Sequence, residues 1–113
     1  MRTVIQRVRR AEVTVDGATV GRIGRGLLLL VAIEKGDTDE DVEVTAQKVA
    51  AMRVFPDRSP MDCSVVDIDG EVLVVSQFTL VGRLNKGRRP SFDRAEDPAR
   101  AERMVTALAR RFV

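Results

Sequence analysis

The sequence has 113 residues, of which 44% are hydrophobic and 32% are charged, and its formal net charge is +2. These values are typical of one soluble globular domain, so we expect a single domain over residues 1–113. There is no His and only one Cys, Cys63, which excludes an internal disulfide, the usual zinc sites, and Ser-His-Asp or Cys-His catalysis within one chain. Catalysis would then use carboxylates, hydroxyls, Lys, Arg, backbone amides or the substrate itself, and we expect no metal and no cofactor.

The sequence gives no sign of membrane insertion or export. The longest apolar run, residues 27–33, is far shorter than the roughly 20 residues of a membrane-spanning helix. The first residues lack the apolar stretch of a signal peptide. We therefore expect a cytoplasmic protein with no membrane partner.

The first third of the chain predicts strands. Residues 1–10 alternate loosely and residues 11–15 alternate clearly between apolar and polar side chains. Asp16-Gly17 predicts a hairpin turn into a return strand, and residues 27–33 predict a strand buried on both faces. The glycines between these strands are followed by no helix, so turns and bulges are favoured over a phosphate-binding loop.

Residues 37–40, Asp-Thr-Asp-Glu, predict the start of a helix. Asp37 is expected to cap it, with Glu40 at the reciprocal position of a capping box, and the helix should end near Arg53 because Pro56 follows. The acidic residues are contiguous and are not spaced as in a calcium loop, so a helix cap is favoured over a metal site. The apolar positions at helical spacing are Val42, Ala46, Val49 and Ala50.

A second hairpin is predicted at Asp69-Gly70, between a short strand at residues 65–68 and an apolar strand at residues 72–75. Polar side chains then appear where the apolar strand ends: Ser76, Gln77 and Thr79, with Phe78 between them. Polar groups at the exit of a rigid buried strand are well placed to form a site. The alternative is a strand that simply ends at the surface.

A strongly basic segment follows. It contains Arg83, Lys86, Arg88, Arg89 and Arg94. It is interpreted either as a solvated loop or as a phosphate-binding rim beside the polar strand exit. Because the net charge is only +2, any contact with nucleic acid should be local.

Asp97 and Pro98 predict the N-cap and first residue of a second helix, which is expected to run to Val113. Its apolar positions are Ala101, Met104, Val105, Leu108 and Phe112. The order of elements predicts an α/β fold: a layered mixed sheet with both helices on one face.

Six stretches in the same order resemble the D-aminoacyl-tRNA deacylases, formerly called D-tyrosyl-tRNA deacylases. They are residues 5–8 (Ile-Gln-Arg-Val), 11–17 (Ala-Glu-Val-Thr-Val-Asp-Gly), 24–30 (Gly-Arg-Gly-Leu-Leu-Leu-Leu), 53–55 (Arg-Val-Phe), 73–80 (Leu-Val-Val-Ser-Gln-Phe-Thr-Leu) and 86–92 (Lys-Gly-Arg-Arg-Pro-Ser-Phe). The resemblance implies a β/β/α layered fold and a homodimer with active sites at the subunit interface. It also implies hydrolysis of the ester between a D-amino acid, or glycine, and the terminal adenosine of tRNA, as proofreading in translation.

Ser76, Gln77, Phe78 and Thr79 match the family's first signature, and the resemblance makes them the catalytic segment. Thr79 has been read in the family as a nucleophile. The fuller picture uses the backbone amides around Phe78 and Thr79, assisted by the ribose 2′-hydroxyl. This picture fits a sequence without His, because an unactivated Thr hydroxyl is a poor nucleophile whereas preorganised amides stabilise an oxyanion without titrating. Substrate-binding roles are expected for Arg7, Lys86, Arg88 and Arg89.

One family motif is missing. No Gly-Pro-x-Thr segment occurs, although in the family this segment reaches into the partner's site, rejects L-amino acids, and is braced from the position that Arg7 matches. The chain is therefore expected to be truncated at its C-terminus and to discriminate poorly between enantiomers. Two alternatives stay open: a tRNA-binding module, or a dimeric scaffold, each without stereospecific catalysis.

Overall fold

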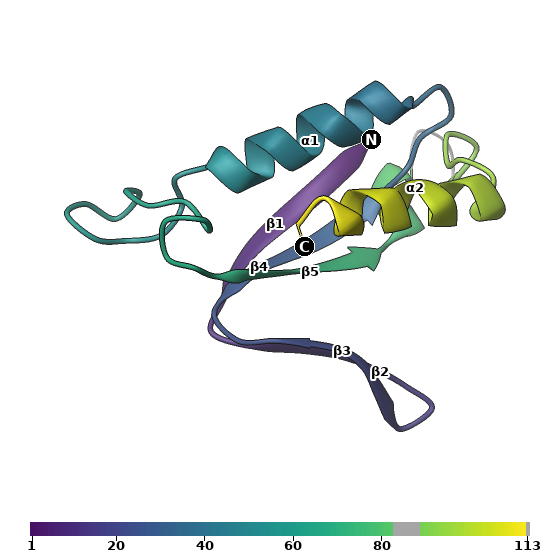
Figure 1. The fold of residues 1–113 in the computed structure, drawn as a ribbon. Helices are drawn as coiled ribbons and strands as arrows, with labels where there is room; N and C mark the ends of the chain where they lie inside the picture. The colour runs from purple at the N-terminus through teal and green to yellow at the C-terminus, as the bar shows by residue number, and fades with distance from the viewer. Residues whose placement is uncertain (83–88, 113) are drawn as a thin grey trace.

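The structure is a computed structural model, and it describes residues 1–82 and 89–112. A three-stranded sheet is covered by helices on one face, and a separate two-stranded ribbon extends away from it (Figure 1). The elements in chain order are β1 (Arg2–Val8), β2 (Ala11–Val15), β3 (Ala18–Ile23), β4 (Gly26–Ala32), α1 (Asp39–Ala51), β5 (Glu71–Ser76), the 3₁₀ helix η1 (Phe78–Val81) and α2 (Pro98–Arg110).

The three-stranded sheet has the order β1-β4-β5, with β1 antiparallel and β5 parallel to the central strand β4. Alternate residues of β4 face the helices, and Leu27, Leu29 and Val31 are fully buried there. Both helices lie on this face, which confirms the predicted mixed sheet with two helices on one side (Figure 1). The strand predicted at residues 27–33 is confirmed as β4.

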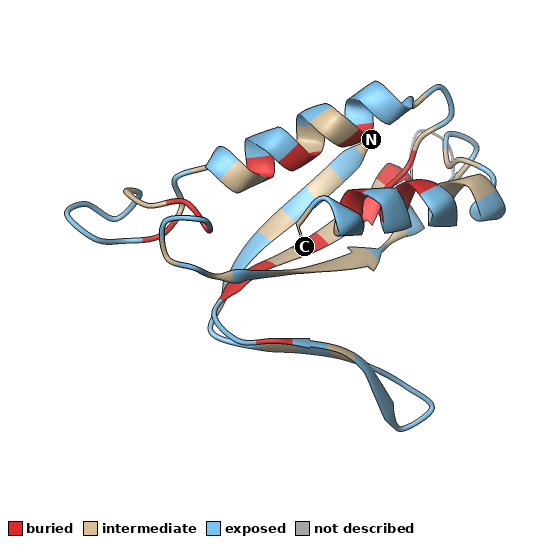
Figure 2. Cartoon of the chain, viewed as in Figure 1, coloured by how far each residue is buried: buried red, intermediate tan, exposed pale blue. Residues whose placement is uncertain are grey.

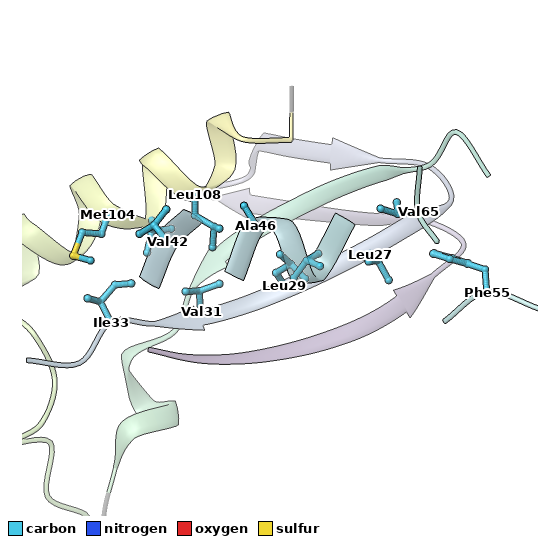
Figure 3. Close-up of a cluster of buried hydrophobic side chains, with 12 residues drawn as sticks. Leu27, Leu29, Val31, Ile33, Val42, Ala46, Phe55, Val65, Met104 and Leu108 are labelled. Carbon is cyan, nitrogen blue, oxygen red and sulfur yellow. The ribbon is translucent and has the colours of Figure 1, made fainter. Parts of the chain in front are cut away.

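The core fills the space between β4 and the two helices (Figure 3). Val42, Ala46 and Val49 of α1 and Met104, Val105 and Leu108 of α2 are buried, as the helical spacing predicted. In Figure 2 the buried positions of both helices lie on the side facing the sheet. Burial of these apolar stripes holds the helices in place, because each helix of 13 residues is too short to be stable alone in water.

The hairpin turn predicted at Asp16-Gly17 is confirmed. Both residues adopt positive φ, 50° and 80°, as a tight turn between β2 and β3 requires. The ribbon carries a register irregularity between Val13 and Thr14. It leaves the layer of the sheet, so its apolar residue Val20 is 64% exposed.

The predicted second hairpin is wrong. Residues 65–69 form turns, not a strand, and β5 pairs in parallel with β4, so it has no hairpin partner before it. The local cause is a reciprocal pair of hydrogen bonds: the Ser64 N–H donates to the Asp67 carboxylate at 2.9 Å, and the Asp67 N–H donates to the Ser64 hydroxyl at 3.1 Å. Such side-chain bonds compete with strand pairing. As an edge strand, β5 is also half-buried, not covered on both faces.

The predicted helix ends also need correction. Thr38, not Asp37, is the N-cap of α1, and Asp41, not Glu40, completes the capping box by accepting the Thr38 N–H at 2.8 Å. This hydrogen bond lowers the pKa of Asp41. The helix α1 ends at Ala51, two residues before the predicted Arg53. The predicted cap Asp97 and first residue Pro98 of α2 are confirmed, but α2 ends at Arg110.

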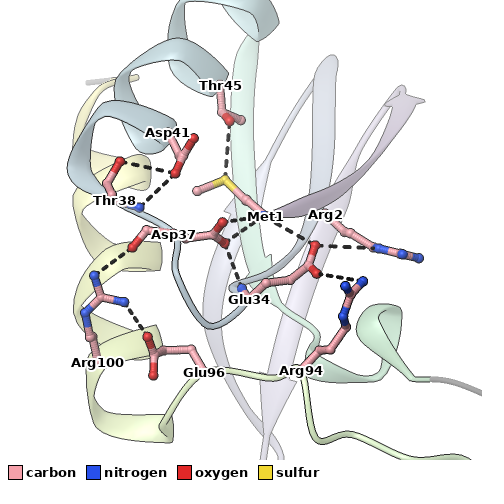
Figure 4. A network of polar contacts seen from close by, with 10 residues as sticks. All are labelled: Met1, Arg2, Glu34, Asp37, Thr38, Asp41, Thr45, Arg94, Glu96 and Arg100. Atoms are coloured by element: carbon pink, nitrogen blue, oxygen red, sulfur yellow. Dashed lines mark hydrogen bonds and ion pairs between the residues drawn. The ribbon is translucent and has the colours of Figure 1, made fainter.

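Asp37 has a different structural role (Figure 4). Its carboxylate lies 2.6 Å from the amino group of Met1 and accepts the Glu34 N–H at 2.7 Å. Its carbonyl accepts from Arg100 of α2 at 2.7 Å. Asp37 therefore joins the start of β1, the end of β4 and the first turn of α2.

We expect Asp37→Ala to lower the free energy of unfolding by about 1–3 kcal/mol, because it removes the acceptor of a half-buried ammonium group and of a backbone N–H. Asp39→Ala is the matched control, since Asp39 is exposed in the first turn of α1. The measurement is urea unfolding followed by circular dichroism. Equal stability of the two variants would contradict this role.

Candidate functional site

The candidate site begins where β5 ends. Ser76 lies opposite Val31 in the parallel ladder, and the Gln77 N–H donates to the Val31 carbonyl at 2.8 Å. This bond extends the pairing by one residue and then the chain turns into η1. The four predicted catalytic residues, Ser76, Gln77, Phe78 and Thr79, are thus held against the end of the central strand.

The 3₁₀ helix η1 orients backbone amides at this point. The Leu80 N–H donates to the Gln77 carbonyl and the Gly82 N–H donates to the Thr79 carbonyl, at 3.3 and 3.1 Å. The N–H groups of Phe78 and Thr79 come in the first turn, where a helix leaves donors unpaired, and they have no acceptor within the described residues. Two adjacent free donors at a fixed position are suited to bind a developing negative charge.

Among residues 1–82 and 89–112, no base lies beside the Thr79 hydroxyl. Its hydrogen-bond partner within the described part of the chain is the side-chain amide of Gln77, which donates to it. A neutral amide cannot take a proton from the hydroxyl at neutral pH. The described contacts therefore give the Thr79 hydroxyl no partner that could take up its proton.

A pocket of about 920 Å³ opens beside η1 and runs along the first turns of α2. Its apolar wall consists of Phe78, Phe92, Ala95, Pro98, Ala101 and Val105. The rings of Phe78 and Phe92 meet edge to face, with centroids 5.1 Å apart. Ser76 also lines the pocket, whereas Gln77 and Thr79 do not.

The far wall of the pocket is fixed by residues 94–97. The Lys35 N–H donates to the Arg94 carbonyl and the Glu96 N–H donates to the Ile33 carbonyl, each at 2.9 Å. The Glu96 carboxylate accepts the Asp97 N–H at 2.7 Å and pairs with Arg100. The Asp97 N–H and then Arg100 hold the pKa of Glu96 below its ordinary value.

Sequence reasoning missed Phe92 and Glu96 as parts of a pocket. Phe92 belongs to a recognised stretch, but nothing in the pattern indicated that it would meet Phe78 from a segment fourteen positions away. A capping aspartate one residue after Glu96 was the available local signal, because caps order the preceding residues as well.

Of the predicted substrate-binding residues, the two that the structure describes, Arg7 and Arg89, do not line this pocket. Arg7 lies opposite Leu27, four residues along β4 from the partner of Ser76, or about 13 Å at the rise of a strand. Arg89 is exposed after the described segment resumes. Lys86 and Arg88, like Arg83, lie outside the described residues.

Neither of the described α-helices is both long and apolar enough to cross a membrane.

The fold and this site define an α/β protein whose candidate site follows an edge strand and presents backbone donors. The family model described as D-Tyr-tRNA(Tyr) deacylase matches residues 4–112. The chain therefore belongs to this family of deacylases, as the six sequence stretches predicted.

Individual relatives agree with this assignment. The D-aminoacyl-tRNA deacylase of Persephonella marina is 51% identical over 112 residues, which cover 98% of this chain and 76% of that protein. Among solved structures, c-Myc DNA Unwinding Element Binding Protein superposes with a TM-score of 0.88 at 39% identity, covering 96% of this chain and 73% of that one. A probable eukaryotic D-amino acid tRNA deacylase shares the fold, with a TM-score of 0.76 at 21% identity, over 98% of this chain and 68% of that one.

The depressed pKa of Glu96 predicts a pH-dependent contribution to the pocket wall. A carboxylate whose pKa is lower in the folded state stabilises that state above its unfolded pKa of about 4.3, and the effect disappears as pH falls through the folded pKa. We therefore expect Glu96→Gln to melt at a lower temperature than the wild type at about pH 7 and to approach it at about pH 3. Glu102→Gln, in the same pocket, is the control, and a pH-independent difference for Glu96→Gln would contradict the prediction.

Proposed function

We propose that the protein hydrolyses the ester bond of D-aminoacyl-tRNA, releasing the free D-amino acid and tRNA, and so proofreads translation. Membership of the deacylase family is the single observation that supports this most strongly. Mischarged glycyl-tRNA is proposed as a second substrate, on the family resemblance. Since translation takes place in the cytoplasm, we place the protein there.

The proposed mechanism uses the amides of η1. A water molecule adds to the carbonyl carbon of the ester, and the N–H groups of Phe78 and Thr79 stabilise the oxyanion that forms. The carbon–oxygen bond to the ribose then breaks, and the departing ribose oxygen takes up a proton. The neighbouring 2′-hydroxyl of the substrate assists, which removes the need for a titrating side chain in a protein without His.

Two substitutions of Phe78 separate the contribution of its amide to the rate from that of its side chain. Residue 78 is the first residue of η1, a position where proline removes no intrahelical hydrogen bond, and Gln77 before it is not helical, with φ −145° and ψ 83°. Phe78→Pro removes the N–H donor and the ring together, while Phe78→Ala removes only the ring. The difference between the two variants therefore measures the contribution of the amide.

We expect Thr79→Ala to keep deacylation of D-tyrosyl-tRNA within about tenfold of wild type, because its amide survives. We expect Phe78→Pro to be slower than Phe78→Ala by roughly 10²–10³, the usual cost of one oxyanion donor. Single-turnover release of the amino acid from D- and L-tyrosyl-tRNA is the measurement. An acyl-enzyme trapped on Thr79 would refute this mechanism.

The same assay, combined with a measurement of tRNA binding, distinguishes hydrolysis from the main alternative. A wild-type protein that binds tRNA but releases no amino acid would favour a tRNA-binding or dimeric scaffold module of the same fold. The basic segment with Lys86, Arg88 and Arg89 is proposed to contact the tRNA backbone under either reading.

We further propose a homodimer with active sites at the subunit interface. The sheet face away from the helices supports this proposal. Val4, Leu30 and Val75 lie side by side across the three strands, and Val4 is 46% exposed. Gln6, Leu28 and Leu73 form the neighbouring row. An apolar sheet face of this kind is suited to packing against a second copy.

We expect the wild type to sediment as a dimer and Val4→Asp to sediment as a monomer, because a buried unpaired carboxylate would oppose packing of the two faces. Val44→Asp is the matched control: Val44 is 41% exposed, but on α1. Analytical ultracentrifugation reads out both variants. A monomeric wild type would rule out the dimer.

A further inference from the structure

A second hollow lies at the opposite end of the sheet from η1. It is about 410 Å³ in volume and is lined by Arg7, Val8, Arg9, Arg25, Phe55 and Pro56. Three of these six residues carry a permanent positive charge, and none carries a negative one. We refer to this hollow as the arginine cleft. Its composition is unlike the large pocket beside η1, where the charged residues of the described lining are Glu96, Asp97, Glu102 and Lys35.

Two of the three guanidinium groups are held in place by uncharged partners. Arg7 donates from Nη1 to the Val54 carbonyl at 2.6 Å. The Arg25 guanidinium lies 5.4 Å from the centre of the Phe55 ring, and Phe55 is fully buried, so that ring is a rigid support. These contacts position the side chains without neutralising their charge.

Two other arginines in the same half of the molecule are paired with carboxylates. Arg22 lies 3.1 Å from Glu12, and Arg53 lies 2.7 Å from Asp62. Within the described residues, no ion pair joins Arg7, Arg9 or Arg25 to a carboxylate. Like charges repel one another, so placing three arginines together opposes folding. Because their side chains are oriented without a carboxylate between them, the cleft is suited to bind an anion from outside the protein.

We propose that the arginine cleft binds the phosphodiester backbone of RNA, at a point remote from the ester that is hydrolysed. This inference rests on the proposed function, which supplies tRNA as the ligand. Guanidinium groups bind phosphate oxygens bidentately, and Val54 is the one hydrogen-bond partner of the Arg7 side chain among residues 1–82 and 89–112, which leaves it further donors there. The cleft lies about 13 Å along the sheet from Ser76, so it contacts a different phosphate from that of the terminal adenosine.

The test uses the double variant Arg9→Ala/Arg25→Ala, which leaves the structural bond of Arg7 to Val54 intact. Arg103→Ala/Arg110→Ala is the matched control and removes the same charge from α2. Arg103 and Arg110 line a different hollow, which they share with the acidic residue Glu102. Arg9→Lys/Arg25→Lys retains the charge. Fluorescence anisotropy measures binding of uncharged tRNA to the full chain over a range of KCl concentrations, and circular dichroism verifies that each variant is folded.

Loss of two phosphate contacts should make the slope of log affinity against log salt shallower by about 1.8, with a loss of tenfold or more at about 0.1 M salt. The lysine variant should recover most of the slope, and the α2 variant should match the wild type. A wild-type slope in Arg9→Ala/Arg25→Ala, or an equal loss in the α2 variant, would overturn the inference.

Two further arms separate this inference from the proposed function. Arg88→Ala/Arg89→Ala tests the basic segment. If this variant loses tRNA affinity and Arg9→Ala/Arg25→Ala does not, the arginine cleft is refuted as an RNA site while the proposed function stands. Failure of the wild type to hydrolyse D-tyrosyl-tRNA while the cleft variant still loses salt-dependent tRNA binding refutes the hydrolysis alone. A duplex DNA of tRNA acceptor-stem sequence is compared with the RNA, and cleft-dependent binding to DNA only would overturn the assignment to RNA.

Discussion

The parallel pairing of β5 with β4 is the constraint on which the rest of the structure depends. Because Ser76 is in register with Val31, the chain leaves the sheet at the carboxyl end of the central strand, and the bond from Gln77 to Val31 starts η1 there. The register is set at the other end, where β4 begins at Gly26. A side-chain Cβ at Gly26 would lie 1.8 Å from the Glu71 carbonyl oxygen, so only glycine permits the two strands to meet there.

A second constraint ties the ends of several elements together. Asp37 contacts the amino group of Met1 and, through its carbonyl, Arg100, which also pairs with Glu96. Met1, which directly precedes β1, the loop before α1 and the pocket wall before α2 are thereby held as one unit (Figure 4). The polar contacts lie around the apolar core of Leu29, Val31 and the two helices, which supplies most of the burial.

Two groups of arginines can be distinguished: those paired with carboxylates, which support the structure, and those held by uncharged groups, for which binding of an anion is proposed. Arginines such as Arg53 are paired with carboxylates and support loops, whereas Arg7 and Arg25 are held by a carbonyl and a ring. The candidate site, by contrast, presents the neutral backbone donors of η1. In the proposed mechanism, a protein without His separates binding of an anionic substrate from stabilisation of its reacting group, since neither task requires a side chain that titrates near neutral pH.

The sequence by itself determined the elements whose information is local: the turn at Asp16-Gly17, the buried strand β4, the cap at Asp97, and the family through residues 73–80 and 86–92. It identified Ser76 to Thr79 as one segment because those residues are contiguous. Only the tertiary structure decided the parallel direction of β5, the turn at residues 65–69, the meeting of Phe78 with Phe92, and the distance of Arg7 from Ser76. Strand direction and such encounters depend on contacts between residues far apart in the chain, which periodicity and capping signals do not encode.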